Sequence, residues 1–237
     1  MTADTTLVAA VRAALAERAN PERAVHQQRY MKSALPYWGL ASAEVRAALR
    51  PVFEAHPLPD ADAWRATIAA LWDEVTHREE WYAAIGLWRH RRYRAWARDP
   101  HPASIALLKH LVTTGAWWDV VDEIASHCVG DLLRSAPEVM TPVLGGWARE
   151  ENLWVRRVAI ICQLGSKAGT DRALLTHAIE GSWDDPDFFA RKAIGWALRQ
   201  HSKTDAAWVR AYVAAHADRL PPLSRREALA WLATHGS

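Results

Sequence analysis

The chain has 237 residues, of which half are apolar and 24% are charged. This length can bury a large core, and the composition is that of a globular protein rather than a disordered or fibrous one. The 29 basic and 27 acidic residues nearly balance, so only the placement of the charges, not their sum, can indicate a nucleic-acid partner.

Signals for export and membrane insertion are missing. Residues 1–20 have neither the basic start nor the small-residue cleavage site of a signal peptide, and no apolar run approaches the roughly 20 residues that span a bilayer. The two cysteines, Cys128 and Cys162, are expected as buried free thiols in a reducing compartment. We therefore expect a cytoplasmic protein with no membrane partner.

Helical periodicity runs through the whole chain. Apolar residues recur at i, i+3, i+4 and i+7 in residues 7–17, 43–53, 63–75 and 105–112. Helix breaks rich in proline, glycine, asparagine or aspartate are predicted at residues 20–21, 57–60, 99–102, 115, 135–137, 169–170, 184–186 and 221–222. Strand signals are nearly absent. The sequence therefore predicts an all-α fold of about a dozen helices, each of roughly 11 to 18 residues.

A short phrase of similar sequence recurs along the chain. Its copies end at apolar residues, which are Leu49, Ile85, Ile124, Ile160, Ile194 and Leu229. Successive ends lie 36, 39, 36, 34 and 35 positions apart, and this period is typical of stacked helix pairs. We therefore predict a single domain over residues 1–237, built as a curved solenoid of about six HEAT-like helix pairs.

The repeat also places cations in register. The position three residues before each phrase end holds Arg46, Tyr82, Val121, Arg157, Arg191 and Arg226, and Lys192 and Arg225 lie beside the last two. A row of cations along one face of a solenoid, near helix N-termini, suits a phosphate backbone. The alternative is a solvated helix face on which the arginines are incidental.

One repeat has a carboxylate in this register, because Val121 and Asp122 stand where the next two repeats have Arg157 and Arg191-Lys192. Trp118 precedes Asp122 by four residues, so the indole and the carboxylate would share a helix face. A carboxylate on a cationic surface would repel phosphate unless it has a chemical task. The alternative is structural: an ion pair between Asp122 and Arg157 of the next repeat.

Several longer phrases occur in a characteristic order. They are RYMK at 29–32, TTGAWWDVVD at 113–122, NLWVRR at 152–157, FFARKAIGW at 188–196 and LSRREA at 223–228. Together they span most of the chain and resemble the AlkD family of alkylpurine DNA glycosylases. The resemblance implies an enzyme that binds duplex DNA in the concave groove of a solenoid. It also implies removal of N3- and N7-alkylated purines, without a metal or cofactor and without flipping the base into a pocket.

The resemblance also implies roles for individual residues. By motif position, Asp122 is the catalytic carboxylate, Trp118 and Trp196 hold the deoxyribose of the lesion, Arg157 is the active-site arginine and Tyr30 lies beside the lesion. The remaining candidates are cations expected to contact DNA, namely Lys32, Arg46, Arg156, Arg191, Lys192, Arg199, Arg225 and Arg226. The chain departs from the family at Ala41, where family members carry glutamine, and this alters the contacts expected near the lesion.

The chemistry of a cationic alkylpurine suits these residue types. Such a base leaves as a neutral molecule and needs no general acid, so catalysis consists of stabilising an electron-poor sugar and holding a water. A fixed carboxylate can do both, and an indole face contributes about 0.5–2 kcal/mol towards a developing cation. P-loop, dinucleotide-binding, GxSxG, HExxH and CxxC motifs are absent, and no metal or cofactor is expected.

Two alternatives without catalysis stay open. The first is a HEAT-like module that binds DNA or a protein; it keeps the row of arginines but has no use for Asp122 between two indoles. The second is a general protein–protein scaffold, for which the repeated arginines are not needed. In each case we expect a monomer. Most of the other tryptophans are expected in the core, namely Trp64, Trp72, Trp88, Trp147, Trp208 and Trp231.

Overall fold

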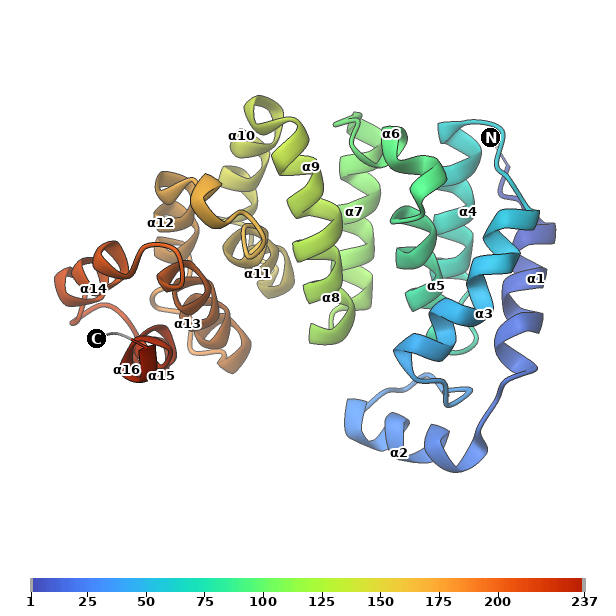
Figure 1. Ribbon diagram of the computed structural model, residues 1–237, viewed down its shortest axis with the longest axis horizontal. Helices are drawn as coiled ribbons and strands as arrows, with labels where there is room; N and C mark the ends of the chain where they lie inside the picture. Colours follow the sequence, from blue (N-terminus) through green and yellow to red (C-terminus); the bar gives the residue numbers. More distant parts are fainter. Residues whose placement is uncertain (1, 236–237) are drawn as a thin grey trace. The chain divides into compact units, whose positions relative to one another are not determined.

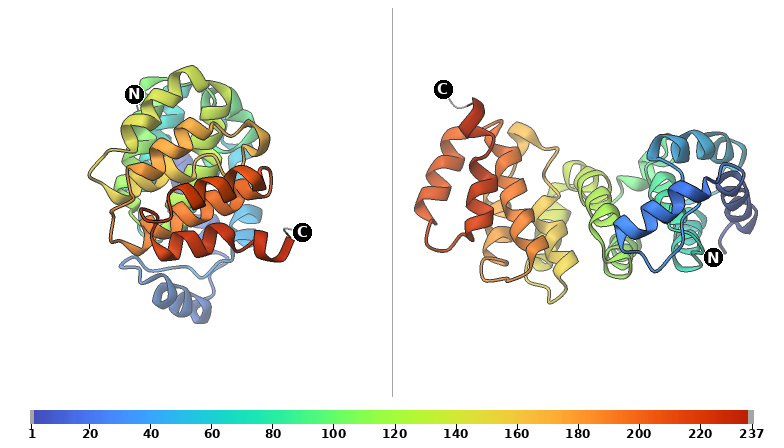
Figure 2. Two further views of the ribbon diagram at one scale, coloured as in Figure 1. Left: turned by 90° about the vertical axis from the view of Figure 1, so that its left-hand side faces the viewer. Right: turned by 90° about the horizontal axis from the view of Figure 1, so that it is seen from below.

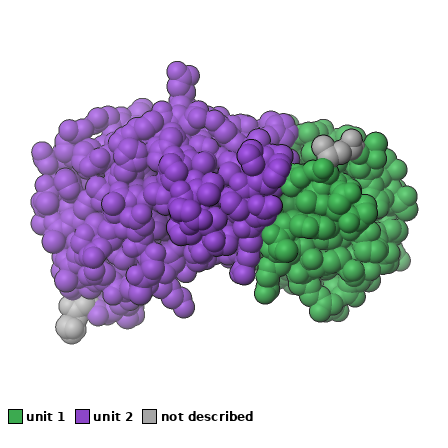
Figure 3. Space-filling model, turned by 90° about the horizontal axis from the view of Figure 1, so that it is seen from above, with its two compact units in different colours: residues 1–97 green, residues 98–237 purple. Residues whose placement is uncertain are grey.

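The computed structural model describes residues 2–235, and all regular structure within them is helical. This confirms the predicted all-α class. The chain divides into two compact units, residues 1–97 and 98–237, which are coloured separately in Figure 3. Within the described range, no helix combines the length and apolarity needed to cross a membrane.

The first unit contains two helix pairs, one inserted helix and two short helical turns at its end. Its helices are α1 (Thr5–Ala16), α2 (Pro21–Met31), α3 (Ser42–Ala55), α4 (Ala61–Asp73), α5 (Glu79–Trp88), the 3-10 helix η1 (Arg91–Tyr93) and α6 (Arg94–Ala97). α1 packs on α3 and α4 packs on α5, while α1 also contacts α4 and α3 contacts α5. The four helices therefore form two layers, and α2 is an insertion at one end of the unit (Figure 1).

The second unit continues the same arrangement. Its helices are α7 (Pro102–Gly115), α8 (Trp118–Glu123), the π-helix η2 (Ile124–Val129), α9 (Gly130–Ser135), α10 (Pro137–Trp147), α11 (Leu153–Ile161), the 3-10 helix η3 (Lys167–Gly169), α12 (Arg172–Glu180), α13 (Phe188–Ser202), α14 (Ala206–Ala215), α15 (Pro222–Leu229) and α16 (Leu232–His235). One row is formed by α8, α11, α13 and α15, each packed on the next, and α10 packs on α12 in a second row. Figure 2 shows the successive helices of this unit from two further directions.

The structure confirms the predicted repeat within each unit. Five of the six phrase ends lie in the second helices of pairs, on α3, α5, α11, α13 and α15, and Ile124 follows directly on α8. All of them are buried except Leu229, which is half-buried. The α-helices run from 4 residues in α6 to 15 in α13, so some have the predicted 11 to 18 residues and others are shorter.

Four of the six tryptophans predicted in the core, and both cysteines, are buried. Trp64, Trp72, Trp88 and Trp147 are buried, whereas Trp208 and Trp231 are half-buried. Cys128 and Cys162 are free and buried. The prediction of buried free thiols is therefore confirmed.

Helices α13 and α15 approach each other closely because glycine lies at their crossing. A Cβ atom at Gly195 would stand 2.5 Å from the Cβ of Glu227 and 3.0 Å from the carbonyl oxygen of Ser224. Ser224 also donates a hydrogen bond of 2.8 Å to the Arg191 carbonyl. The crossing therefore fixes the cationic residues of α13 against those of α15.

Candidate active site

The centre of the candidate site is an ion pair between α8 and α11 in the second unit. Arg157 Nε donates to Asp122 Oδ1 over 2.7 Å, and Arg157 Nη2 donates to Oδ2 over 2.8 Å. The Arg157 side chain is 5% exposed and that of Asp122 is 16% exposed. Two parallel, charge-assisted hydrogen bonds fix the plane of a carboxylate more firmly than one does. The structural pairing that the sequence left open is therefore present.

The third guanidinium nitrogen of Arg157 is bound as well. Arg157 Nη1 donates to the carbonyl oxygen of Phe189, at the start of α13, over 2.6 Å. The guanidinium carbon also lies 5.9 Å from the centre of the Phe189 ring. Every nitrogen of this guanidinium thus has a protein acceptor, so its position is defined by α8 and α13 together.

Burial disfavours the ionised form of Asp122. Burial raises the pKa of the Asp122 carboxyl above its ordinary value, while the hydrogen bonds and the charge of Arg157 act in the opposite direction. The carboxylates of Asp119 and Glu123, on the same helix, also raise this pKa. A buried carboxyl with a raised pKa and a specific cationic partner is a typical feature of a functional site.

The two predicted indoles lie on helices of the same row. Trp118 is half-buried and precedes Asp122 by one turn of α8. Trp196 is half-buried on α13, seven residues after Phe189 and hence on the same side of that helix. Both indoles retain exposed surface, as a ring that contacts a substrate requires.

A cluster of aromatic rings beside Arg157 is not among the predicted site residues. Phe189 lies 5.5 Å from Trp117 and 5.1 Å from Trp154, measured between ring centres, and Trp117 lies 6.2 Å from Trp154. Phe188 packs edge-on against Phe189 and is 57% exposed. The adjacent pairs Trp117-Trp118 and Phe188-Phe189 were the available signal in the sequence, since two neighbouring aromatic residues place rings on more than one side of a helix end.

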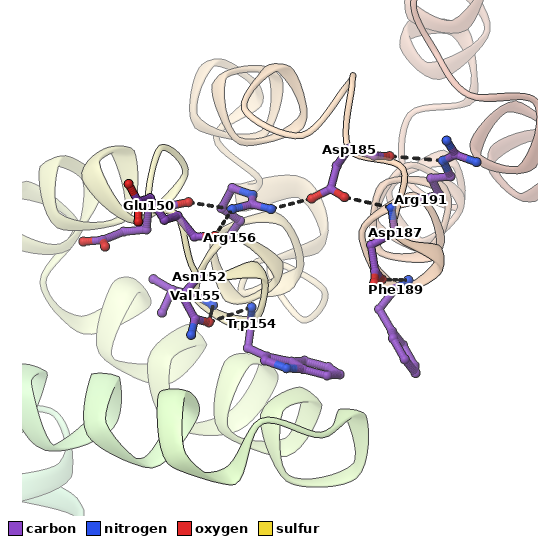
Figure 4. Close-up of polar contacts among 10 residues, drawn as sticks. Glu150, Asn152, Trp154, Val155, Arg156, Asp185, Asp187, Phe189 and Arg191 are labelled. Carbon is purple, nitrogen blue, oxygen red and sulfur yellow. Dashed lines mark hydrogen bonds and ion pairs between the residues drawn. The ribbon is translucent and has the colours of Figure 1, made fainter.

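Arg156 makes contacts within the protein. Its Nη1 donates to the carbonyl oxygens of Glu150 and Glu151 over 2.6 and 2.7 Å, and its Nη2 pairs with the carboxylate of Asp185. Figure 4 shows the side chain extending from the start of α11 towards Asp185 in the connection before α13. Arg191 donates from Nε to the Asp185 carbonyl over 3.1 Å. DNA contacts by Arg156 and Arg191 stay predictions.

The cations of α13 and α15 differ in their partners. Lys192 Nζ and Arg199 Nη1 lie 3.0 and 2.8 Å from the two carboxylate oxygens of Glu227. The hydrogen bond from Lys192 is the largest factor that lowers the pKa of Glu227. Arg225 is half-buried and Arg226 is exposed, and neither forms an ion pair with a carboxylate among residues 2–235.

The remaining predicted residues belong to the first unit. Tyr30, at the end of α2, is 75% exposed. Lys32 caps the same helix in a left-handed conformation with φ of 51° and is exposed, as is Arg46 on α3. Ala41 precedes α3, and its N–H donates to the Glu44 carboxylate over 2.6 Å. These groups are accessible to a large ligand.

Metal ligands are not clustered in the part of the chain that the structure describes. No three histidine, cysteine, aspartate or glutamate side chains of residues 2–235 are grouped so that they could hold an ion. The chemistry that the site offers through its own side chains is that of one carboxylate, one fixed guanidinium and exposed aromatic faces.

Comparison with known proteins shows which family the chain resembles. A family model described as DNA alkylation repair enzyme matches residues 11–232, a range that includes every candidate residue above. A solved structure, described as a predicted DNA alkylation repair enzyme from Enterococcus faecalis, shares 32% sequence identity and superposes with a TM-score of 0.80. That match covers 91% of this chain and 97% of the other. A search of curated proteins finds no match.

Proposed function

Because the chain belongs to the DNA alkylation repair enzyme family, we propose that it is a monofunctional DNA glycosylase of the AlkD type. It hydrolyses the N-glycosidic bond of cationic N3- or N7-alkylated purines, such as 3-methyladenine and 7-methylguanine, in duplex DNA. The observation that carries the proposal is the Asp122 carboxylate, fixed by two hydrogen bonds from Arg157. Trp118 lies one turn before it on α8.

The reaction needs one anionic group beside the sugar. The C1′–N bond breaks with its electron pair going to the cationic purine, which leaves as a neutral base. The sugar is then electron-poor, and the carboxylate of Asp122 stabilises it electrostatically. A water oxygen bonds to C1′ and gives its proton to this carboxylate as a general base. The products are the free base and an abasic site.

Arg157 acts on Asp122 rather than on DNA in this proposal. All three of its nitrogens have acceptors within the protein, and its side chain is 5% exposed. Its charge and hydrogen bonds counteract the effect of burial on the Asp122 pKa and so favour the ionised form that the reaction uses.

Other predicted residues bind the DNA substrate. Trp118 and Trp196 hold the deoxyribose of the lesion with their exposed indole faces, and the base is not flipped into a pocket. Tyr30, Lys32 and Arg46 of the first unit and Arg191, Arg225 and Arg226 of the second contact the duplex, so that residues 1–237 act as one domain. The enzyme works as a cytoplasmic monomer and uses no metal or cofactor.

The test is single-turnover release of 7-methylguanine from a duplex oligonucleotide at moderate salt. Asp122→Asn is expected to lower the rate about 100-fold or more, because a general base and electrostatic stabiliser is removed. Its affinity for DNA is expected to stay within a few-fold of wild type. Asp131→Asn, which alters an exposed carboxylate of α9 paired with Arg134, is the matched control and should react at the wild-type rate.

Each contrary outcome has a defined meaning. Wild-type release by Asp122→Asn would disprove the carboxylate mechanism while leaving the activity in place. Tight DNA binding without release by any variant would favour a non-catalytic DNA-binding module. Circular dichroism of each variant shows whether the fold is retained.

A further inference from the structure

Consecutive arginines at the start of α11 serve two different sets of contacts. Arg157 binds Asp122 and the Phe189 carbonyl, whereas Arg156 binds the connection before α13. Adjacent residues of a helix point about 100° apart, so neighbouring guanidinium groups can hold different elements. Arg156 therefore contributes to the site through other elements than Arg157 does.

The ion pair of Arg156 with Asp185 is largely sequestered from solvent. The two side chains are 15% and 11% exposed. The same guanidinium donates to the carbonyls of Glu150 and Glu151, over 2.6 and 2.7 Å. With these acceptors in place, Arg156 ties the α10–α11 connection to the α12–α13 connection and has little capacity left for a phosphate.

Asp185 also binds residues at the start of α13. Its Oδ1 accepts the N–H of Asp187 over 2.8 Å, and its carbonyl accepts Arg191 Nε over 3.1 Å. Asp187 in turn caps α13 by accepting the N–H of Phe189 over 2.6 Å. Figure 4 shows this series of contacts running from Arg156 to the first turn of α13. The Asp185 carboxylate, together with the Asp187 cap, thus fixes the position of the first turn of α13.

Phe189 connects the series to the reaction centre. Its carbonyl accepts Arg157 Nη1 over 2.6 Å, and Arg157 holds both oxygens of Asp122. A displacement of the first turn of α13 would therefore shift the acceptor of Arg157 and rotate the guanidinium that orients the carboxylate.

We propose that Arg156 and Asp185 are positioning residues for Asp122: their ion pair fixes the Phe189 carbonyl, which fixes Arg157 and through it the carboxylate. The inference rests on the proposed glycosylase activity. Neither residue touches the reacting atoms, and the pair acts through three intervening residues, Asp187, Phe189 and Arg157. Its effect therefore falls on the rate of the chemical step rather than on DNA affinity.

The chain supplies a matched control in the neighbouring carboxylate. Asp184 lies in the same connection, but its side chain is 86% exposed and its pair with Arg219 is 3.2 Å long. Asp185→Asn is expected to lower the single-turnover rate at saturating enzyme about 10-fold, since poorer alignment slows a positioned reaction. The enzyme concentration at half-saturation is expected to stay unchanged. Asp184→Asn is expected to match wild type in both.

A spectroscopic readout separates this inference from the proposed function. The Nε–H proton of Arg157 gives an NMR signal that is assigned by its disappearance in Arg157→Lys. We expect Asp185→Asn to shift this signal and Asp184→Asn to leave it in place, whether or not the protein excises alkylpurines. An absence of release by wild type, with the shift observed, would therefore count against the glycosylase activity only.

The remaining outcomes decide the inference itself. A wild-type rate and an unshifted Arg157 signal in Asp185→Asn would overturn it. A change in the enzyme concentration at half-saturation, with the rate unchanged, would also overturn it, because that result assigns the pair to DNA binding. Arg156→Lys, which keeps the charge but has one nitrogen in place of the Nη1 that binds the Glu150 and Glu151 carbonyls and the Nη2 that binds Asp185, is the second variant should Asp185→Asn fail to fold. It is expected to lower the rate in the same way, and a wild-type rate for it overturns the inference.

Discussion

At the scale of single residues, the Asp122–Arg157 pair combines a structural contact with a chemical one. Removing one member of a buried ion pair leaves its partner without compensation, which typically costs about 3–5 kcal/mol of stability. Arg157 is the more buried of the two, with 5% of its side chain exposed against 16% for Asp122. The pair thus stabilises the α8–α11 contact and at the same time presents a carboxylate at the surface of that contact.

Substitution of Arg157 is expected to change the pH dependence of the reaction. Burial raises the Asp122 pKa and Arg157 opposes it, so Arg157→Met leaves burial dominant and raises this pKa further. Activity requires ionised Asp122 and is lost as the pH falls through its pKa, so the acid limb should move to higher pH in the variant. The measurement is the single-turnover rate between about pH 5 and pH 9. A shift of the limb to lower pH would contradict this assignment.

The sequence predicted part of this site for a simple reason. Asp122 and Arg157 are separated by one repeat, so the period alone places them side by side on α8 and α11. The contributions of Asp185 and Phe189 carry no periodic signal. One is an aspartate in a connection between helices and the other acts through its backbone carbonyl, and only the folded chain brings them to Arg157.

At the scale of helices, the crossing of α13 and α15 holds the end of the row together. The small size of Gly195 permits this approach, since a Cβ atom there would meet the Cβ of Glu227 at 2.5 Å. Glu227 in turn pairs with Lys192 and Arg199 of α13. Close packing and electrostatic pairing therefore act at the same place on the two helices.

Gly195→Ala is expected to destabilise the protein despite the higher helix propensity of alanine. The added methyl group forces α13 and α15 apart, and overpacking of this kind costs about 1–3 kcal/mol. Gly146→Ala in α10 is the control, because nothing lies within 4 Å of its added Cβ; it should stabilise the protein by about 0.5–1 kcal/mol. The measurement is the free energy of unfolding in urea. Equal stability of both variants would show that the helices separate freely.

The sequence predicted the positions of the second helices of the pairs, but it did not predict the π-helical turn or the inserted helix. The spacing of the apolar phrase identifies α3, α5, α8, α11, α13 and α15, because burial recurs with the repeat. The π-helix η2 follows α8 without a break, and the rarity of such turns gives the sequence pattern no signal for one. The insertion of α2 likewise carries no signal of its own in the repeat.

At the scale of the whole molecule, the number of cations overstates the charge available to DNA. Arg156, Arg157, Lys192 and Arg199 are each paired with a carboxylate of the second unit, and the chain carries a net charge of only +2. The cations of α15 are different, since Arg225 and Arg226 lack such a pair among the described residues. The predicted basic row is therefore uneven along its length.

The salt dependence of DNA binding tests this uneven distribution. Replacing Arg225 and Arg226 together by glutamine is expected to weaken binding to all sequences. It should also reduce the slope of log affinity against log salt by about 1 for each phosphate that is no longer neutralised. Arg210→Gln, which alters an exposed arginine of α14 outside the predicted DNA contacts, should leave the slope unchanged. An unaltered slope in the double variant would exclude these two arginines from the DNA interface.

The division of labour between Arg156 and Arg157 also restricts how the gene can change. The Asn152 side chain caps α11 by accepting the N–H groups of Trp154 and Val155, over 2.9 and 3.2 Å, and so sets the point from which the helix is counted. A codon inserted between the cap and the arginines would turn both side chains by about 100° in the same direction. Arg156 would then take the direction that Arg157 has now, and Arg157 would face neither set of partners. Point substitutions in this turn alter one contact at a time, whereas an insertion or a deletion displaces both guanidinium groups at once. We therefore expect a change in the length of this short stretch to be tolerated less well than a substitution at most of its positions.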